Sequence, residues 1–350
     1  MKRKILFWVV TGLLVFFMGV LVYSYLPLGP AMKLDVSTPI LDDAALTDPD
    51  AADPALEDSS QKDDIPAVGD IQSTGQEKAG SQANLTPCGS GSFIFIILGD
   101  SQIETKGQRG FSSIRLVKVD FENQVVTIAA LSPDLWVRTR LSGLEGAASL
   151  TRIHWQGYQL AHGEERRRIS AAASAVAQAL VDNFVVVSDH YLHIRLEIFS
   201  DLIDALGGVE VNLPQAMDGG ILGLYPTGLQ VLDGKQAGNF VRMWKVAGDS
   251  TPSEAERIAR QDILLLGLLK QAKSPSVLLK APALVETFYD NLFTDLSPKE
   301  LLSMICLLNQ PGLVIHNVNA IDGFTTPGEG RILLPLDQKL QQLLAYQFRK

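Results

Sequence analysis

Phe93-Ile-Phe-Ile-Ile-Leu-Gly-Asp100 is a continuous apolar run that ends in a Gly-Asp turn. Such a run, uninterrupted by polar residues, is typical of a central strand that is buried on both faces of a sheet. Two further runs, Ile114–Asp120 and Val125–Leu131, follow it and are separated by Phe121-Glu-Asn-Gln. They predict adjacent strands or a hairpin beside the first strand.

Helical patterns alternate with further short strands along the rest of the chain. The spacing of apolar residues predicts a helix over 164–183, and Gly207-Gly208 ends another that starts near Phe199. Asp233 can cap a helix that runs to Val241. Ser253-Glu-Ala-Glu256 matches a capping box, and a long apolar helix follows it to Lys273. We expect the remaining strands at 185–187, 191–196, 209–213 and 313–318, and the remaining helices at 277–289, 298–308 and 336–348. This alternation predicts an α/β fold with a central mixed β-sheet flanked by helices.

The N-terminus has the pattern of a membrane anchor. Lys2, Arg3 and Lys4 precede an uncharged run, Ile5–Leu26, and a bilayer core of roughly 30 Å needs about 20 such residues. A cleaved signal peptide, the alternative, has a shorter apolar core of about 7–15 residues. We therefore expect a cytoplasmic tail at 1–4, a transmembrane helix at 5–26 and an extracytoplasmic C-terminal part, since basic residues favour the cytoplasmic side.

Residues 27–91 read as an acidic, disordered linker. The segment from Lys33 to Lys78 holds 12 acidic and three basic residues, and this imbalance accounts for the whole formal charge of -9. The remainder of the chain is neutral, and it shows no interleaving of basic and aromatic residues. We therefore predict no nucleic-acid partner.

Two cysteines, Cys88 and Cys306, stand far apart in the sequence. Outside the cytoplasm such a pair can persist as a disulfide. Cys306 also lies in an apolar, helix-like run, where a buried free thiol is equally plausible. The sequence leaves both alternatives open.

Two carboxylates follow predicted strands directly. Asp100 ends the first strand, and Asp134 follows the third in Leu131-Ser-Pro-Asp-Leu-Trp136. Ligands of open α/β sheets bind beyond the carboxyl ends of strands, where a carboxylate can hold a hard cation or accept a proton. The alternative is that each aspartate only caps a turn.

A cationic group is expected at the start of the long helix. Arg257, Arg260 and Gln261 share one helix face, and Arg242 ends the preceding predicted helix. Together with free backbone N–H groups, these side chains would form a clamp for phosphate or pyrophosphate. The alternative is a solvated face on which Glu254 and Glu256 balance the arginines.

The ordered set of these stretches resembles the LytR–CpsA–Psr family of bacterial cell-envelope proteins. The resemblance covers roughly residues 93–275 and is strongest in Leu202-Ile-Asp-Ala-Leu-Gly-Gly-Val-Glu-Val-Asn-Leu-Pro214 and in Arg257-Ile-Ala-Arg-Gln261. It places an LCP-like α/β domain at 92–275 and a C-terminal helical and strand extension at 276–350.

The resemblance implies a membrane-bound phosphotransferase that moves a glycopolymer from a polyprenyl-pyrophosphate carrier to peptidoglycan, typically with Mg²⁺. It implies Asp100 as a metal ligand and Asp134, Arg257 and Arg260 as catalytic residues. The pyrophosphate would be bound by five residues: Arg109, Arg242, Arg257, Arg260 and Gln261.

Several charged positions of the family pattern are replaced in this chain. Ser112 stands where a second acidic metal ligand is expected, and Pro133 and Trp244 stand where arginines are expected. Gly110 also replaces an arginine, although Arg109 is adjacent. Each missing charge-assisted contact is worth roughly 1.5–3 kcal/mol. An alternative is therefore a relative that binds the lipid-linked polymer or wall glycan without turnover, and a third is a tethered structural or regulatory partner without a lipid ligand.

Overall fold

The computed structural model describes residues 88–105, 108–144, 146–243, 254–318, 320, 324–325, 334–335 and 339–349. The expected transmembrane helix and nearly all of the acidic linker lie outside these residues. Among the described helices, none combines the length and the apolar character needed to cross a bilayer.

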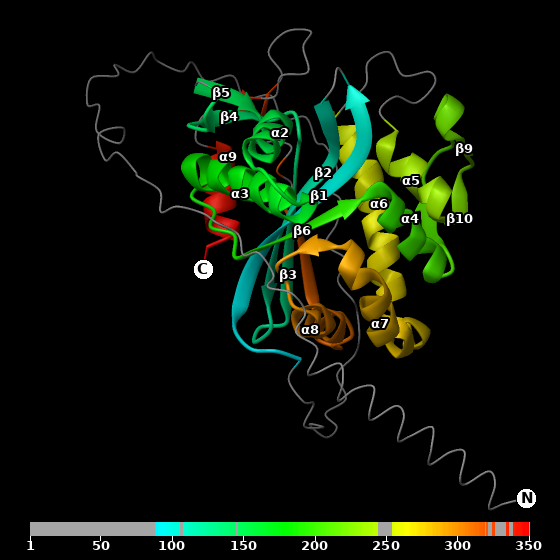
Figure 1. Cartoon of the computed structure of the whole chain (residues 1–350). Coiled ribbons are helices and arrows are strands. Elements are labelled where there is room, and N and C mark those ends of the chain that lie inside the picture. Colours follow the sequence, from blue (N-terminus) through cyan, green and yellow to red (C-terminus); the bar gives the residue numbers. More distant parts are fainter. Residues whose placement is uncertain are drawn as a thin grey trace, which may run out of the picture.

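A six-stranded mixed sheet forms the centre of the molecule, in agreement with the predicted α/β class (Figure 1). Its central strand β1 pairs antiparallel with β2 and parallel with β6, and β3 in turn pairs antiparallel with β2. Two edge strands complete it, β11 antiparallel to β6 and β12 parallel to β3. The order is β11 (Phe293–Thr294), β6 (His190–Arg195), β1 (Ser92–Thr105), β2 (Gln108–Asp120), β3 (Val125–Leu131) and β12 (Val314–Val318).

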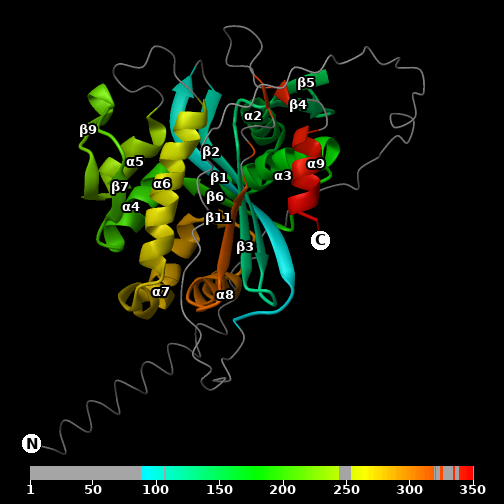
Figure 2. The same ribbon diagram turned by 180° about the vertical axis from the view of Figure 1, so that it is seen from behind.

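Helices cover both faces of this sheet (Figures 1 and 2). Side chains that alternate along β1 divide between two cores, with Ile94, Ile96 and Leu98 on one side and Phe95 on the other. The first face packs against α2 (Leu150–Leu160), α3 (Glu165–Phe184) and α9 (Lys339–Gln347). The second face lies under α6 (Glu254–Ala272) and α8 (Pro298–Leu308).

A smaller apolar cluster lies beside the second face. It joins α4 (Leu196–Ala205), α5 (Gly234–Arg242) and α6 to a hairpin of β7 (Val209–Leu213) and β10 (Gly228–Leu232). Gly267 allows α6 to approach this hairpin closely, because a Cβ atom there would lie 2.3 Å from the Glu210 carbonyl oxygen. Asp233 caps α5 in a capping box with Gln236, as its sequence predicts. The cluster thus fixes the C-terminal end of α5 against α6.

The segment after residue 275 is built into the main sheet. It supplies α7 (Pro275–Phe288), η3 (Tyr289–Asn291), α8, α9 and both edge strands. A short pair, β13 (Phe324–Thr325) and β14 (Leu334–Pro335), also belongs to it. The residues expected to form an extension therefore complete the sheet of the preceding domain.

Local differences from the sequence-based expectations have simple causes. The expected strand at 185–187 is wrong, because Val185 adopts a left-handed conformation (φ 57°) and its N–H closes the end of α3 on the Val181 carbonyl. Two small antiparallel pairs were not predicted: β4 (Trp136–Thr139) with β5 (Gly146–Ser149), and β8 (Met217–Asp218) with β9 (Leu224–Tyr225), the latter enclosing η2 (Gly220–Leu222).

Cys88 and Cys306 form a disulfide with a Cα–Cα distance of 5.5 Å. It joins the residue at the start of the described chain to α8, under the second face of the sheet. The alternative of two free thiols, which the sequence left open, is therefore resolved in favour of the bridge.

Candidate functional site

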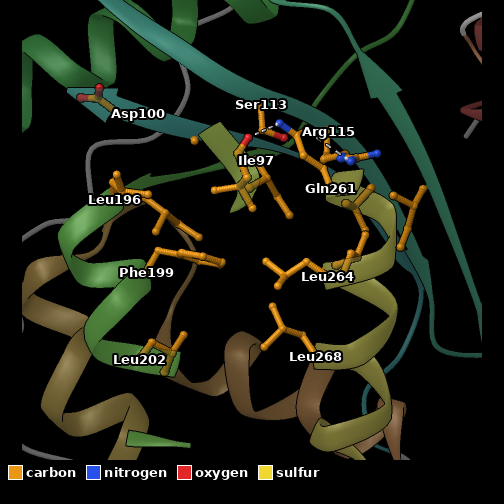
Figure 3. Close-up of a pocket in the computed structure, with 16 residues that line it drawn as sticks. Ile97, Asp100, Ser113, Arg115, Leu196, Phe199, Leu202, Gln261, Leu264 and Leu268 are labelled. Carbon is orange, nitrogen blue, oxygen red and sulfur yellow. Dashed lines mark hydrogen bonds between the residues drawn. The ribbon is translucent and has the colours of Figure 1, made fainter. Parts of the chain in front are cut away.

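A cavity of about 250 Å³ lies over the second face of the sheet, between α4 and α6 (Figure 3). Its floor is formed by strand residues and its two sides by leucine-rich helix faces. The lining residues are Ile97, Gly99, Asp100, Ser113, Arg115, Val117, Ile128, Ile194, Leu196, Phe199, Leu202, Val241, Gln261, Leu264, Leu265 and Leu268.

The walls of the cavity are almost wholly apolar. On α4, Leu196, Phe199 and Leu202 follow one another at a spacing of three residues, so they lie on one helix face. On α6, Leu264 and Leu268 are four residues apart and face them across the cavity (Figure 3). Volumes of small-molecule pockets are about 300–1,000 Å³. The cavity therefore suits a narrow hydrocarbon group or part of a longer one.

Ser113, Arg115 and Gln261 lie together at one end of the cavity, and Asp100 lies apart from them at the rim (Figure 3). Arg115 is only 5% exposed, and its Nη1 lies 2.6 Å from Asp262 Oδ1. Its Nη2 donates a longer hydrogen bond of 3.5 Å to Gln261 Oε1. Burial lowers the pKa of Arg115, and the adjacent Asp262 carboxylate opposes this shift. The cavity is thus amphipathic, with an apolar body and a charged end.

The three α6 residues predicted to bind phosphate lie together at the start of the helix, and all are buried. Arg257, Arg260 and Gln261 are 6%, 4% and 6% exposed. Arg257 donates two hydrogen bonds to Glu254, from Nε to Oε2 at 2.8 Å and from Nη2 to Oε1 at 2.5 Å. Glu254 therefore does balance the charge of Arg257. The pair is enclosed, however, and does not form a solvated face.

Arg260 and Gln261 hold the end of α5. Arg260 Nη2 donates to the Met243 carbonyl at 2.8 Å, and Gln261 Nε2 donates to the Val241 carbonyl at 3.3 Å. The last carbonyl groups of a helix lack intrahelical donors, so these contacts satisfy them. They bring Arg242, which donates from Nη2 to Asn239 Oδ1 at 2.5 Å, to the same end of α5. Of these predicted residues, only Gln261 lines the cavity.

Asp100 lies at the rim of the cavity, where a bulge interrupts the register of β1 with β2. Its carboxylate points away from the apolar interior (Figure 3), and its Oδ2 lies 3.9 Å from His193 Nε2. His193 in turn stacks on His154 with ring centroids 5.7 Å apart. Burial holds the pKa of His154 well below its usual range, and the neighbouring His193 adds to this shift.

The described residues include no group of three or more His, Cys, Asp or Glu side chains arranged to hold a metal ion. Asp100 is 6% exposed and offers one carboxylate at the rim. Mg²⁺ is commonly held by one or two carboxylates together with water and phosphate oxygens. The residues present therefore fit a Mg²⁺ ion that shares its ligands with a phosphate, but not a cage made of protein groups alone.

Other predicted positions do not join this site within the described structure. Asp134 lies on the turn after β3, where its N–H donates to Ser132 Oγ at 3.1 Å, and it does not line the cavity. Pro133 accepts a hydrogen bond from the Thr151 N–H on the α2 side of the sheet. The backbone of Arg109 pairs with Glu104. The side chains of Arg109 and Ser112, and the whole of Trp244, lie outside the described part.

Sequence reasoning missed Arg115 and Asp262. An arginine within a strand ordinarily faces water, so Arg115 gave no signal by residue type. Its position in the strand did give a signal. Arg115 alternates with Ile114 and Leu116, so it had to share a sheet face with Val117. Which face α6 would cover could not be read from the sequence.

Comparisons with known proteins agree on one family. The model of the LytR_cpsA_psr family matches residues 67–345. The chain is 26% identical over 243 residues to the cell wall biosynthesis protein LcpA of Corynebacterium glutamicum, covering 65% of this chain and 46% of LcpA. It is 31% identical over 128 residues to the polyisoprenyl-teichoic acid–peptidoglycan teichoic acid transferase TagU of Oceanobacillus iheyensis, covering 37% and 39%. The matches thus span less than half the length of these two relatives.

Solved structures share the fold. The crystal structure of Bacillus subtilis TagV superposes with a TM-score of 0.59 at 18% identity, over 74% of this chain and 98% of that one. The structure of TagT bound to LI-WTA gives a TM-score of 0.54 at 17% identity, over 76% and 94%. Because the family model covers most of the chain, this protein belongs to the LytR–CpsA–Psr family.

Proposed function

We propose that this protein transfers a glycopolymer from a polyprenyl-pyrophosphate carrier to peptidoglycan. The observation that carries the proposal is the amphipathic cavity: leucine and phenylalanine side chains line its body, and Arg115 and Gln261 lie at one end. A prenyl diphosphate has the same division, with a narrow apolar chain and a compact anionic head. Burial of the chain would remove apolar surface from water at about 25 cal/mol per Å².

The names of relatives support the same reaction class. LcpA of Corynebacterium glutamicum is a cell wall biosynthesis protein, and the TagU and TagV proteins are teichoic acid transferases to peptidoglycan. This chain covers only part of the length of each of these relatives. The cavity adds an argument of its own, because it suits a lipid-linked donor.

Transfer of a phosphoryl group depends mainly on positioning and on stabilisation of charge. In this proposal Arg242, Arg257 and Arg260 bind the pyrophosphate, and Gln261 contacts a phosphate oxygen at the cavity end. Asp100 would hold Mg²⁺ jointly with phosphate oxygens, and the ion would neutralise part of the developing charge. An acceptor hydroxyl attacks the sugar-linked phosphorus while the bond to the lipid phosphate breaks. Asp134 does not line the cavity. To take the proton of the acceptor hydroxyl, it would have to come close to the phosphate together with the acceptor.

Membrane attachment is part of the proposal. The uncharged run Ile5–Leu26, preceded by Lys2, Arg3 and Lys4, would anchor the chain with its catalytic domain outside the cytoplasm. The acidic linker would hold that domain off the anionic membrane surface. An anchored enzyme meets a membrane-bound donor at high local concentration.

A second candidate function is binding without turnover. It is favoured by Ser112 in place of a carboxylate, because Mg²⁺ prefers carboxylate oxygens. It is also favoured by the two hydrogen bonds that Arg257 makes to Glu254, since these engage donors a pyrophosphate would need. The third alternative, a structural partner without a lipid ligand, is disfavoured by the apolar cavity.

The test incubates the full-length chain in detergent with Mg²⁺, a polyprenyl-diphosphate-linked glycan and peptidoglycan. Release of polyprenyl phosphate together with glycan attached to peptidoglycan is the expected result. Binding of the donor without release would support the second candidate function. Absence of donor binding would contradict both.

A further inference from the structure

Arg115 carries a positive charge on a largely apolar face of the sheet. It lies on β2 next in line to Val117, on the face covered by α6 and α8, while Ile114 and Leu116 face the opposite core. It is 5% exposed. A buried cation is costly unless it is paired and hydrogen-bonded, so its presence under α6 needs an explanation.

The immediate partner of Arg115 comes from α6. Asp262 Oδ1 lies 2.6 Å from Arg115 Nη1, and the Asp262 side chain is 22% exposed while that of Arg115 is 6% exposed. Gln261 Oε1 accepts a longer bond from Nη2. The charge of Arg257 also lowers the pKa of Arg115, which indicates that a second cation lies near.

The simplest explanation is a structural link that ties β2 to α6. A buried ion pair is a poor device for stability, however, because replacement by apolar residues of similar volume is often neutral or stabilising. The position of Arg115 suggests a different role. Among the residues that line the cavity in the described structure, it is the one cation, and it lies at the polar end (Figure 3).

We propose that Arg115 binds the phosphate directly attached to the prenyl chain, and that Asp262 positions its guanidinium for this contact. This inference rests on the proposed function and identifies which phosphate each group holds. A chain seated among Phe199, Leu264 and Leu268 would bring its first phosphate to Arg115. Arg257 and Arg260, which do not line the cavity, would contact the second phosphate.

The assignment of Arg115 to the first phosphate and of Arg257 and Arg260 to the second predicts which ligands lose affinity when Arg115 is replaced. Loss of Arg115 should weaken binding of a prenyl monophosphate and of a prenyl diphosphate alike, because both carry the first phosphate. It should leave binding of the prenol, which has no phosphate, unchanged. A merely structural link would instead affect all three ligands together or none.

The experiment titrates geranylgeraniol, geranylgeranyl monophosphate and geranylgeranyl diphosphate into the full-length chain in lipid nanodiscs. The variants are Arg115→Met and Asp262→Asn, with Arg138→Met on the exposed surface of β4 as the matched control. Arg115→Met should weaken both phosphates on the order of 10- to 100-fold, as expected for a lost charge-assisted contact. Asp262→Asn should weaken both phosphates by a smaller factor, because the asparagine oxygen can still accept a hydrogen bond from the guanidinium but no longer holds it by charge.

Three results would overturn the role of Arg115. In the first, Arg115→Met binds both phosphates as tightly as the unaltered chain does. In the second, it loses as much affinity for geranylgeraniol as for the phosphates. Weakening by Asp262→Asn to the same extent as by Arg115→Met would also overturn it. If Arg115→Met does not fold, the double variant Arg115→Met/Asp262→Leu replaces the pair by apolar groups and should show the same loss. If the unaltered chain binds none of the three ligands, the proposed function itself fails.

Discussion

The Cys88–Cys306 disulfide should contribute a large part of the stability of the folded domain. The two residues are 218 positions apart, so the bridge closes nearly the entire described chain into one loop. In the chain-entropy model a loop of this length restricts the unfolded state by about 5 kcal/mol, although measured gains are typically 2–4 kcal/mol. For a domain of roughly 250 residues, 1 kcal/mol moves the Tm by about 2–4 °C.

We therefore expect the double variant Cys88→Ser/Cys306→Ser to unfold about 5–15 °C below the unaltered chain. The measurement is thermal unfolding of the full-length protein followed by circular dichroism, with and without a reducing agent. The reducing agent should lower the Tm of the unaltered chain and have no effect on the double variant. A Tm difference below about 2 °C between the oxidised protein and the double variant would contradict this expectation, because it would mean that the bridge hardly restricts the unfolded chain.

Three further outcomes follow from the site and its surroundings. Arg257→Met should weaken diphosphate binding more than monophosphate binding. It should also destabilise the fold by about 3–5 kcal/mol, because it leaves Glu254 buried and unpaired. In denaturant unfolding and ligand titration, the double variant Glu254→Gln/Arg257→Met should recover the stability but not the affinity. Leu264→Trp should abolish prenol binding by filling the cavity, whereas Leu266→Trp, on the exposed face of α6, should not; equal binding by both variants would contradict the cavity assignment. The hydrogen bond to Asp295 raises the pKa of His190 above its unfolded value of about 6.5, so the stability that protonated His190 contributes should be complete below about pH 6.5 and lost as pH rises through the raised pKa. The denaturant midpoints at pH 6 and pH 9 should therefore differ less in His190→Gln than in the unaltered chain. An undiminished difference would show that His190 is not the source of the pH dependence.

The elements predictable from sequence are those whose own residues determine them. The apolar run that starts at Phe93 could only be a buried strand, and it is the centre of the sheet. The cap at Asp233 and the Pro298 start of α8 were equally local signals. The two-residue strand β11 was not predictable, because its place at the sheet edge depends on pairing with His193 and Leu192 of β6.

Helix α2 shows why other elements were missed. It has a mixed polar sequence, and its close packing depends on Gly157, where a Cβ atom would lie 2.8 Å from the Ala175 Cβ of α3. The buried residues of α2 do recur at helical spacing, but two of the five are His154 and Gly157, so the apolar signal in its own sequence is weak. Its place in the fold is thus decided by tertiary packing.

The candidate site was predictable to a similar degree. Arg257, Arg260 and Gln261 were recognised from their shared helix face, and they do lie together and buried. Gln261 lines the cavity and the two arginines do not, because the way α6 sits on the sheet decides which of its residues reach the cavity. That same packing buries Arg115 beside Asp262, so the residue that best defines the charged end of the cavity had no local signature.

A crystal structure of this protein with geranylgeranyl diphosphate would test the donor site directly. The prenyl chain should lie between α4 and α6, among Phe199, Leu202 and Leu268, with its first phosphate at Arg115 and Gln261. A ligand bound with its phosphates at the apolar end, or outside the cavity while the cavity remains empty, would contradict this placement.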